Sequence, residues 1–130
     1  PYYLETEYVA AMDWLRENSR PEEVVLSSLT IGQYVPALSG NTAYLAHWAN
    51  TVDFYGKEQD VAAFFDSASA DPARVAVVRD FAVDYVLYGP AERALGSYSP
   101  QQIAWLTPVF QQGSVTLYQV SEERLAGAQP

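Results

Sequence analysis

VVLSS, residues 24–28, begins with three consecutive apolar residues and then turns polar. A strand with one face in water alternates apolar and polar side chains, whereas an unbroken apolar run is typical of a strand covered on both faces. Such strands occur mainly in parallel sheets that carry helices on each side. The stretch therefore predicts a central strand of an α/β domain.

Two further segments have the composition of strands. TAYLA, 42–46, and DYVLYG, 84–89, are short apolar runs with β-branched or aromatic residues. Segments of helical character separate the three strands, which favours parallel pairing with right-handed crossovers. The predicted helices and helical turns span 5–18, 30–38, 57–68, 72–81, 91–95 and 101–106.

The C-terminal part of the chain predicts a hairpin. VTLYQV, 115–120, is a clear strand, and Gln112-Gly113 separates it from an extended segment over 107–111. The whole pattern predicts a small Rossmann-like three-layer sandwich with parallel strands in the order 2-1-3 and an antiparallel hairpin at one edge. We expect residues 1–120 to form a single α/β domain and residues 121–130 to form a frayed tail.

Composition excludes several classes of function. The chain of 130 residues has 16 acidic and seven basic residues, for a net charge of −9. Because binding to nucleic acid depends on clusters of Lys and Arg, no nucleic-acid partner is expected. No cysteine and one histidine are present, which excludes disulfides, thiolate chemistry and a two-histidine metal site. GxGxxG, P-loop and GxSxG motifs are missing, so neither a cofactor nor a metal is expected.

Polar residues follow each of the three predicted parallel strands. Ligands of an open parallel sheet bind beyond the carboxyl ends of its strands, near the point where the strand order switches. The loops after 24–28, 42–46 and 84–89 should therefore converge at one edge of the sheet. The binding candidates at this edge are Ser28, His47, Trp48, Thr51, Lys57, Glu92 and Arg93.

The histidine loop also has structural interpretations. His47 can bond a backbone carbonyl, Trp48 can serve as packing, and the Thr51 hydroxyl can cap a helical turn. A catalytic triad of Ser28, His47 and Asp53 lacks any supporting motif. No residue is therefore assigned a catalytic role.

The charged candidates have simple alternatives as well. Lys57 can pair with Asp53 or Asp60 near the start of a helix, which contributes a few tenths of a kcal/mol. Glu92 and Arg93 can form a solvated ion pair, which also contributes little. Both interpretations stay open beside that of a binding site.

Four stretches together resemble a known class of proteins. AMDWLRENSRPEEVVLSS, VPALSGNTAYLAHWANT, FAVDYVLYGPAER and PVFQQGSVTLYQV are similar to the soluble C-terminal region of multi-pass bacterial membrane proteins that are glycosyltransferase-like, of the mannosyltransferase (C-type) class. The likeness covers most of residues 8–120. Its most distinctive part is the loop with His47, Trp48 and Thr51, where Ala46 departs from the glycine that precedes the His-Trp pair in that pattern.

The resemblance implies a small α/β domain that follows a bundle of membrane helices and lies on the extracytoplasmic face. The catalytic carboxylates of that class lie in loops between membrane helices, and no apolar run here reaches the roughly 20 residues of a membrane span. The abrupt start at Pro1-Tyr2-Tyr3 leads us to expect a domain cut from a longer chain.

The function that this resemblance implies is that of a non-catalytic accessory domain that helps to form an acceptor or partner site. Its expected partners are the membrane-embedded part of the same parent chain and a glycan or lipid-linked sugar. Two alternatives remain: a carbohydrate- or partner-binding module that uses Trp48 and Tyr55, and a small hydrolase that uses His47 with Ser28 or Glu92.

Overall fold

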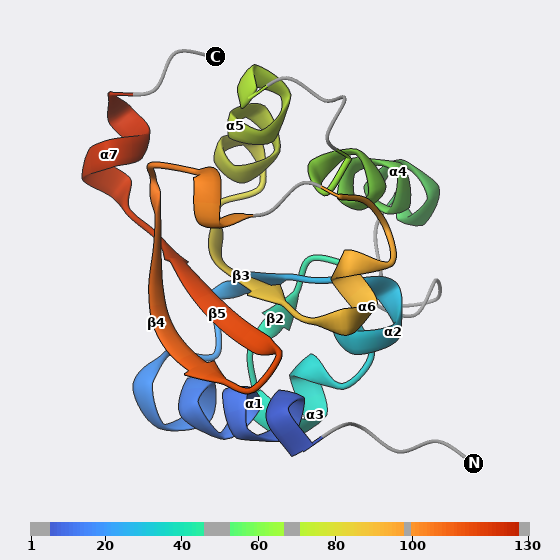
Figure 1. The fold of residues 1–130 in the computed structure, drawn as a ribbon, viewed down its shortest axis with the longest axis vertical. Helices are drawn as coiled ribbons and strands as arrows, with labels where there is room; N and C mark the ends of the chain where they lie inside the picture. The colour runs from blue at the N-terminus through green and yellow to red at the C-terminus, as the bar shows by residue number, and fades with distance from the viewer. Residues whose placement is uncertain (1–5, 46–52, 67–70, 98–99, 128–130) are drawn as a thin grey trace.

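Five strands form one mixed sheet in the order β2-β1-β3-β5-β4 (Figure 1). The computed structural model describes residues 6–45, 53–66, 71–97 and 100–127. The strands are β1 Val24–Leu26, β2 Thr42–Ala43, β3 Val83–Tyr88, β4 Leu106–Gln112 and β5 Val115–Val120. β1 is parallel to both β2 and β3, whereas β5 is antiparallel to both β3 and β4. The predicted parallel order 2-1-3 and the C-terminal hairpin are therefore confirmed.

Helices flank this sheet. They are α1 Thr6–Asn18, α2 Leu29–Gly32, α3 Val35–Ser39, α4 Phe54–Phe64, α5 Asp71–Asp80, α6 Pro90–Arg93 and α7 Glu122–Ala126, with a 3-10 turn η2 at Pro100–Gln102. The helix predicted over 101–106 is wrong, because η2 ends at Gln102 and Leu106 already pairs with Val120 of β5. Burial of Leu106 in this sheet outweighs its local helical preference.

The central strands are buried on both faces, as the run at 24–28 predicts. Val25 and Leu26 of β1 have no exposed surface, yet they belong to different core clusters on opposite sides of the sheet. Leu87 and Val86 of β3 divide in the same way. Each of these strands therefore needs a layer of helices on each side, which is the physical basis of the three-layer fold.

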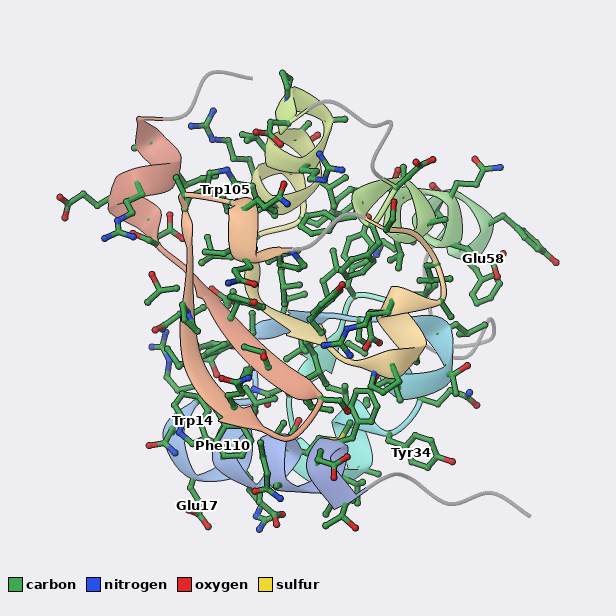
Figure 2. The ribbon with its side chains drawn as sticks, in the orientation of Figure 1. Trp14, Glu17, Tyr34, Glu58, Trp105 and Phe110 are labelled. Carbon is green, nitrogen blue, oxygen red and sulfur yellow. The ribbon has the colours of Figure 1, made fainter. Side chains whose placement is uncertain are left out.

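One layer consists of α1, α2 and α3. Tyr8, Ala11, Met12 and Leu15 recur at helical spacing on one face of α1, and all four are buried in the core cluster on this side of the sheet. Trp14 of α1 and Phe110 of β4 pack against the same cluster at its periphery (Figure 2).

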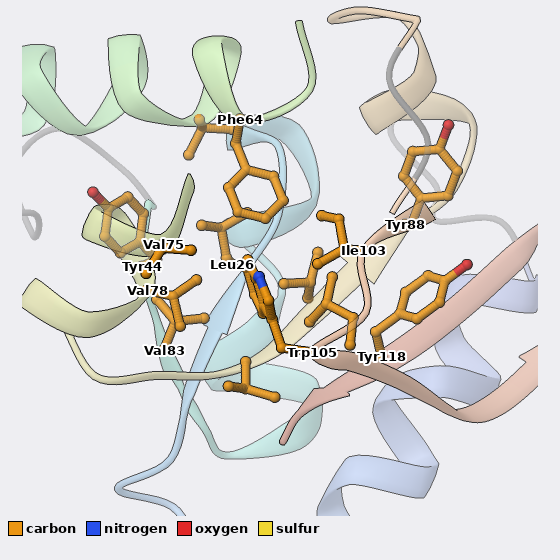
Figure 3. Packing of buried hydrophobic residues seen from close by; sticks show 14 of the residues in the cluster. Leu26, Tyr44, Phe64, Val75, Val78, Val83, Tyr88, Ile103, Trp105 and Tyr118 are labelled. Carbon is orange, nitrogen blue, oxygen red and sulfur yellow. The ribbon is translucent and has the colours of Figure 1, made fainter. Parts of the chain in front are cut away.

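The opposite layer consists of α4, α5 and α7. Phe64 of α4 and Val78 of α5 meet Leu26 and Trp105 in the second cluster (Figure 3). This cluster extends across the sheet from β1 to the C-terminal hairpin, where it includes Tyr118.

The C-terminal segment is ordered as a helix over Glu122–Ala126, where the sequence led us to expect a frayed tail. The Ser121 hydroxyl caps this helix by accepting a hydrogen bond from the Arg124 N–H at 3.3 Å. Leu125 is 5% exposed and joins the core, and its carbonyl accepts a hydrogen bond from Arg79 at 2.6 Å. A cap and one buried leucine thus hold the segment against α5.

Leu117 provides a direct test of two-sided burial. Its side chain has no exposed surface and lies at the centre of β5, opposite Leu87 of β3. Replacement Leu117→Ala is expected to lower the free energy of unfolding by about 2–5 kcal/mol, through lost burial and the cavity left behind. Urea denaturation measures the loss. Gln119→Ala, at an exposed position of the same strand, should change stability by less than about 0.5 kcal/mol, and equal losses would contradict the assigned register.

Candidate functional site

The carboxyl ends of β1 and β3 meet at one edge of the sheet, as predicted. Ser28 lies two residues beyond β1, and Glu92 lies in α6, directly after β3. The Ser28 N–H donates a hydrogen bond to Glu92 Oε2 at 2.9 Å. Two of the predicted site residues, 64 positions apart in the sequence, are therefore in direct contact.

The Glu92 carboxylate is the centre of this contact. Its Oε1 atom accepts hydrogen bonds from the Tyr8 hydroxyl at 2.6 Å and from the Gly89 N–H at 2.9 Å. The Tyr8 oxygen in turn accepts a hydrogen bond from the Ala91 N–H at 3.1 Å. The group formed by Tyr8, Ser28, Gly89 and Glu92, here called the Glu92 clamp, joins α1, the end of β1 and the start of α6.

Glycine is required at position 89 by the close approach of Tyr8. A Cβ atom at this position would lie 2.4 Å from the Tyr8 hydroxyl oxygen and 2.9 Å from a methyl group of Val115. The absence of a side chain therefore lets the Tyr8 ring reach the carboxylate.

Burial controls the electrostatics of the Glu92 clamp. Glu92 is 0% exposed, and this burial raises the pKa of its carboxyl, while the hydrogen bonds from Tyr8, Ser28 and Gly89 oppose the rise. A buried carboxylate is tolerated only where donors replace its lost hydration. In this conformation the carboxyl group is enclosed by protein and serves to join elements of the fold.

Arg93 points away from this carboxylate. The expected solvated pair of Glu92 with Arg93 is not formed, because Glu92 turns inward while the Arg93 guanidinium lies over the Tyr88 ring, 4.7 Å from its centroid. A guanidinium over an aromatic face is a favourable cation–π contact. Arg93 therefore remains at the exposed side of the same loop.

Lys57 has aromatic neighbours instead of the expected carboxylates. Its ammonium lies 5.2 Å from the ring centroid of Tyr44 and 5.1 Å from that of Phe81. Asp60, one of its two predicted partners, accepts a hydrogen bond from the Tyr44 hydroxyl at 2.8 Å. Lys57 thus belongs to an aromatic cluster beside β2, and its described contacts do not include the Glu92 clamp.

The remaining predicted site residues, His47, Trp48 and Thr51, lie outside the described residues. Their place at the same edge stays a prediction.

Sequence reasoning did not find Tyr8, which completes the Glu92 clamp from 84 positions away. Tyr8 lies on the buried apolar face of α1. A tyrosine that is 1% exposed on such a face requires a partner for its hydroxyl, and this requirement is the signal that could have pointed to it.

The described part of the chain has neither a metal-binding cluster nor a membrane-spanning helix. It contains no cluster of three or more His, Cys, Asp or Glu side chains that could hold a metal ion. None of its helices is long and apolar enough to cross a membrane.

The fold and the Glu92 clamp define a small mixed α/β domain with a closed carboxyl edge between β1 and β3. The chain belongs to a family of unknown function, DUF6541, whose family model matches residues 1–122. Its fold is similar to that of the C-terminal globular domain of an oligosaccharyltransferase from Archaeoglobus fulgidus, with a TM-score of 0.67 and 16% sequence identity. The likeness covers 92% of this chain and 99% of the archaeal one. No curated protein sequence matches the chain.

Removal of the Tyr8 hydroxyl tests the Glu92 clamp. The change Tyr8→Phe leaves the Ala91 N–H without its acceptor and Glu92 Oε1 with one donor fewer. We expect a loss of about 1–3 kcal/mol in the free energy of unfolding, measured by urea denaturation. Tyr55→Phe is the matched control, because Tyr55 is 75% exposed, and a similar loss in both variants would rule out a special role for Tyr8.

The raised pKa of Glu92 predicts a pH-dependent contribution to stability. A carboxyl whose folded pKa lies above its ordinary value of 4.5 binds more protons in the folded state. Its stabilising contribution is therefore complete below the unfolded pKa and is lost as pH rises through the folded pKa. The free energy of unfolding of the wild type, minus that of Glu92→Gln, should therefore decrease as pH is raised over this window.

Urea titrations of both proteins at a series of pH values measure this difference. Glu58→Gln, at an exposed position, should stay within about 0.5 kcal/mol of the wild type. If the free energy of unfolding of the wild type, minus that of Glu92→Gln, increases with pH, the pKa of Glu92 is lowered in the folded state and the prediction is wrong.

Proposed function

We propose that this chain is a non-catalytic accessory domain of a membrane glycosyltransferase-like protein. The observation that carries the proposal is the similarity in fold to the C-terminal globular domain of an oligosaccharyltransferase, which extends over nearly the whole of both chains. The sequence resemblance to C-terminal domains of glycosyltransferase-like proteins supports the same function independently of the coordinates. In this proposal, the reaction itself belongs to another part of the parent protein.

The geometry of the Glu92 clamp supports the non-catalytic part of the proposal. A catalytic acid or base must come within hydrogen-bond distance of the substrate. Glu92 has no exposed surface, and backbone and tyrosine donors already occupy both of its oxygens. Opening this site to a substrate would leave a buried N–H at Ser28 or Gly89 without an acceptor, which costs about 1–3 kcal/mol for each group.

The finer features of the proposal come from the sequence resemblance. The parent is a multi-pass bacterial protein of the mannosyltransferase (C-type) class, and the domain lies on its extracytoplasmic face. Its partner is the membrane-embedded part of the same parent chain, beside which it helps to form an acceptor site for a glycan or lipid-linked sugar. The net charge of −9 favours a position away from direct contact with anionic lipid headgroups.

The reading frame and the exposure of the domain in cells test this function together. The gene is expected to encode several apolar runs of about 20 residues before Pro1. Because the chain has no cysteine, Glu58→Cys introduces one thiol into the domain at an exposed position of α4 (Figure 2). With the native cysteines of the parent replaced, a membrane-impermeant maleimide should label this thiol in intact cells.

Ala11→Cys is the matched control, since Ala11 has no exposed surface and a thiol there should resist labelling until the protein is denatured. A reading frame that starts within a few residues of Tyr2 would overturn the proposal. Labelling of the Glu58→Cys protein only after cell lysis would overturn the extracytoplasmic face.

A further inference from the structure

A groove of about 310 Å³ opens beside the C-terminal hairpin. The described residues that line it come from η2, β4 and β5 and are Gln101, Leu106, Pro108, Gln111, Thr116 and Tyr118. The volume falls at the lower end of the range of about 300–1,000 Å³ that is usual for small-molecule sites. The groove is separate from the Glu92 clamp, which contributes none of these residues.

An irregularity in β4 brings the polar side chains into the groove. Pro108 pairs with Tyr118, and Phe110 pairs with Leu117, so that Val109 is an extra residue between them. Val109 and Phe110 both pack against the cluster on the α1 side of the sheet. Since a bulge shifts the alternation of the strand by one, the following residue returns to the face that carries Pro108.

Gln111 is that following residue. It pairs with Thr116, so the two side chains are cross-strand neighbours on one face of the sheet, and both line the groove. Gln101 of η2 contributes a second amide to the lining. Without the extra residue in β4, the Gln111 side chain would lie on the opposite face of the sheet.

Tyr118 lines the groove together with Leu106 and Pro108. It is 6% exposed, and burial raises the pKa of its phenol, so the hydroxyl remains protonated and able to donate. Thr116 and Tyr118 lie two residues apart in β5, so their side chains are on the same face of the sheet. Tyr88 lies next to Tyr118 with its hydroxyl directed to the same side of the packed cluster (Figure 3).

The described part of the lining is neutral, although the chain is strongly acidic. Its described residues include no carboxylate and no cation, although the chain has 16 acidic residues. Primary amides and hydroxyls can donate and accept at the same time, which matches neighbouring hydroxyl groups on a ligand. Leu106, Pro108 and the tyrosine ring offer apolar surface for the C–H groups between those hydroxyls.

We propose that this groove binds a neutral sugar unit of a glycan, with Gln101, Gln111, Thr116 and Tyr118 as hydrogen-bonding residues. The inference names the ligand class of the accessory domain and rests on the proposed function. Arg93, which lies over the neighbouring Tyr88, provides a cation near the groove and makes an anionic sugar the competing ligand.

Binding is measured on the 130-residue chain by two-dimensional NMR with ¹⁵N label. The probes are methyl α-mannoside, methyl β-glucoside and methyl β-N-acetylglucosaminide, with glucose 1-phosphate as the anionic probe. At least one neutral glycoside should give saturable shifts in the amide signals of Gln111 and the backbone of Thr116. The expected dissociation constant is on the order of 1–10 mM, since a single sugar unit has few atoms with which to bind.

Two glutamine-to-alanine variants test whether the sugar binds in this groove. Gln111→Ala is expected to weaken binding at least about tenfold, because the amide pairs with ligand hydroxyls. Gln112→Ala is the matched control: this exposed glutamine is next in the strand, lies on the other face and pairs with Val115, so binding should be unchanged. Arg93→Gln should leave the affinity for neutral glycosides unchanged as well.

Three outcomes would overturn the inference. The first is an absence of shifts from every neutral glycoside at concentrations on the order of 100 mM. The second is equal weakening by Gln111→Ala and Gln112→Ala. The third is binding of glucose 1-phosphate alone, lost in Arg93→Gln, which would assign the groove to an anionic ligand.

These outcomes are distinguishable from a failure of the proposed function. If the Glu58→Cys variant is labelled in intact cells but the domain binds no sugar, the proposed sugar site is refuted and the proposed accessory function stands. If the domain binds sugar but its reading frame encodes no membrane spans, the sugar site is supported and the proposed function as part of a membrane protein is refuted.

Discussion

Burial of the central strands on both faces is the constraint on which the rest of this structure depends. Val25 and Leu26 are consecutive, have no exposed surface and enter different core clusters. A strand of this kind is stable only between two layers, so α1 to α3 must cover one face and α4 with α5 the other. The antiparallel strand β5 continues the same division, since Leu117 and Tyr118 also enter opposite clusters. The C-terminal hairpin is thereby part of the core.

The second constraint acts at the carboxyl edge of the sheet. Enclosing the Glu92 carboxyl there costs hydration, and the fold offsets that cost with three hydrogen-bond donors from separate segments. The same three donors fix α1 and α6 relative to the end of β1. An edge that commonly holds a ligand in open parallel sheets is therefore used, between β1 and β3, to hold the protein together. This use agrees with the proposed role of a non-catalytic accessory domain.

The outer strand of the hairpin, β4, has features that oppose pairing with another chain. β4 lies at the edge of the sheet, where unpaired backbone groups can recruit another chain. Pro108 has no N–H to offer, and the extra residue Val109 interrupts the regular ladder, so both features oppose pairing with a further strand. The same irregularity rotates Gln111 toward the groove. Protection of an edge and construction of a polar groove thus arise from one local change in the strand.

The amino-acid sequence by itself determined the α/β class, the strands and the hairpin, because burial and periodicity are properties of short segments. The parallel order 2-1-3 was predicted from the general rules for connections in open parallel sheets. The sequence also placed Ser28 and Glu92 at one edge, since the ends of parallel strands converge. Tertiary structure alone decided what these residues do. Glu92 faces inward because Tyr8, 84 positions away, donates to it, and Gln111 faces the groove because pairing with β5 leaves Val109 as an extra residue. Both outcomes depend on contacts between distant segments, and local sequence patterns do not encode such contacts.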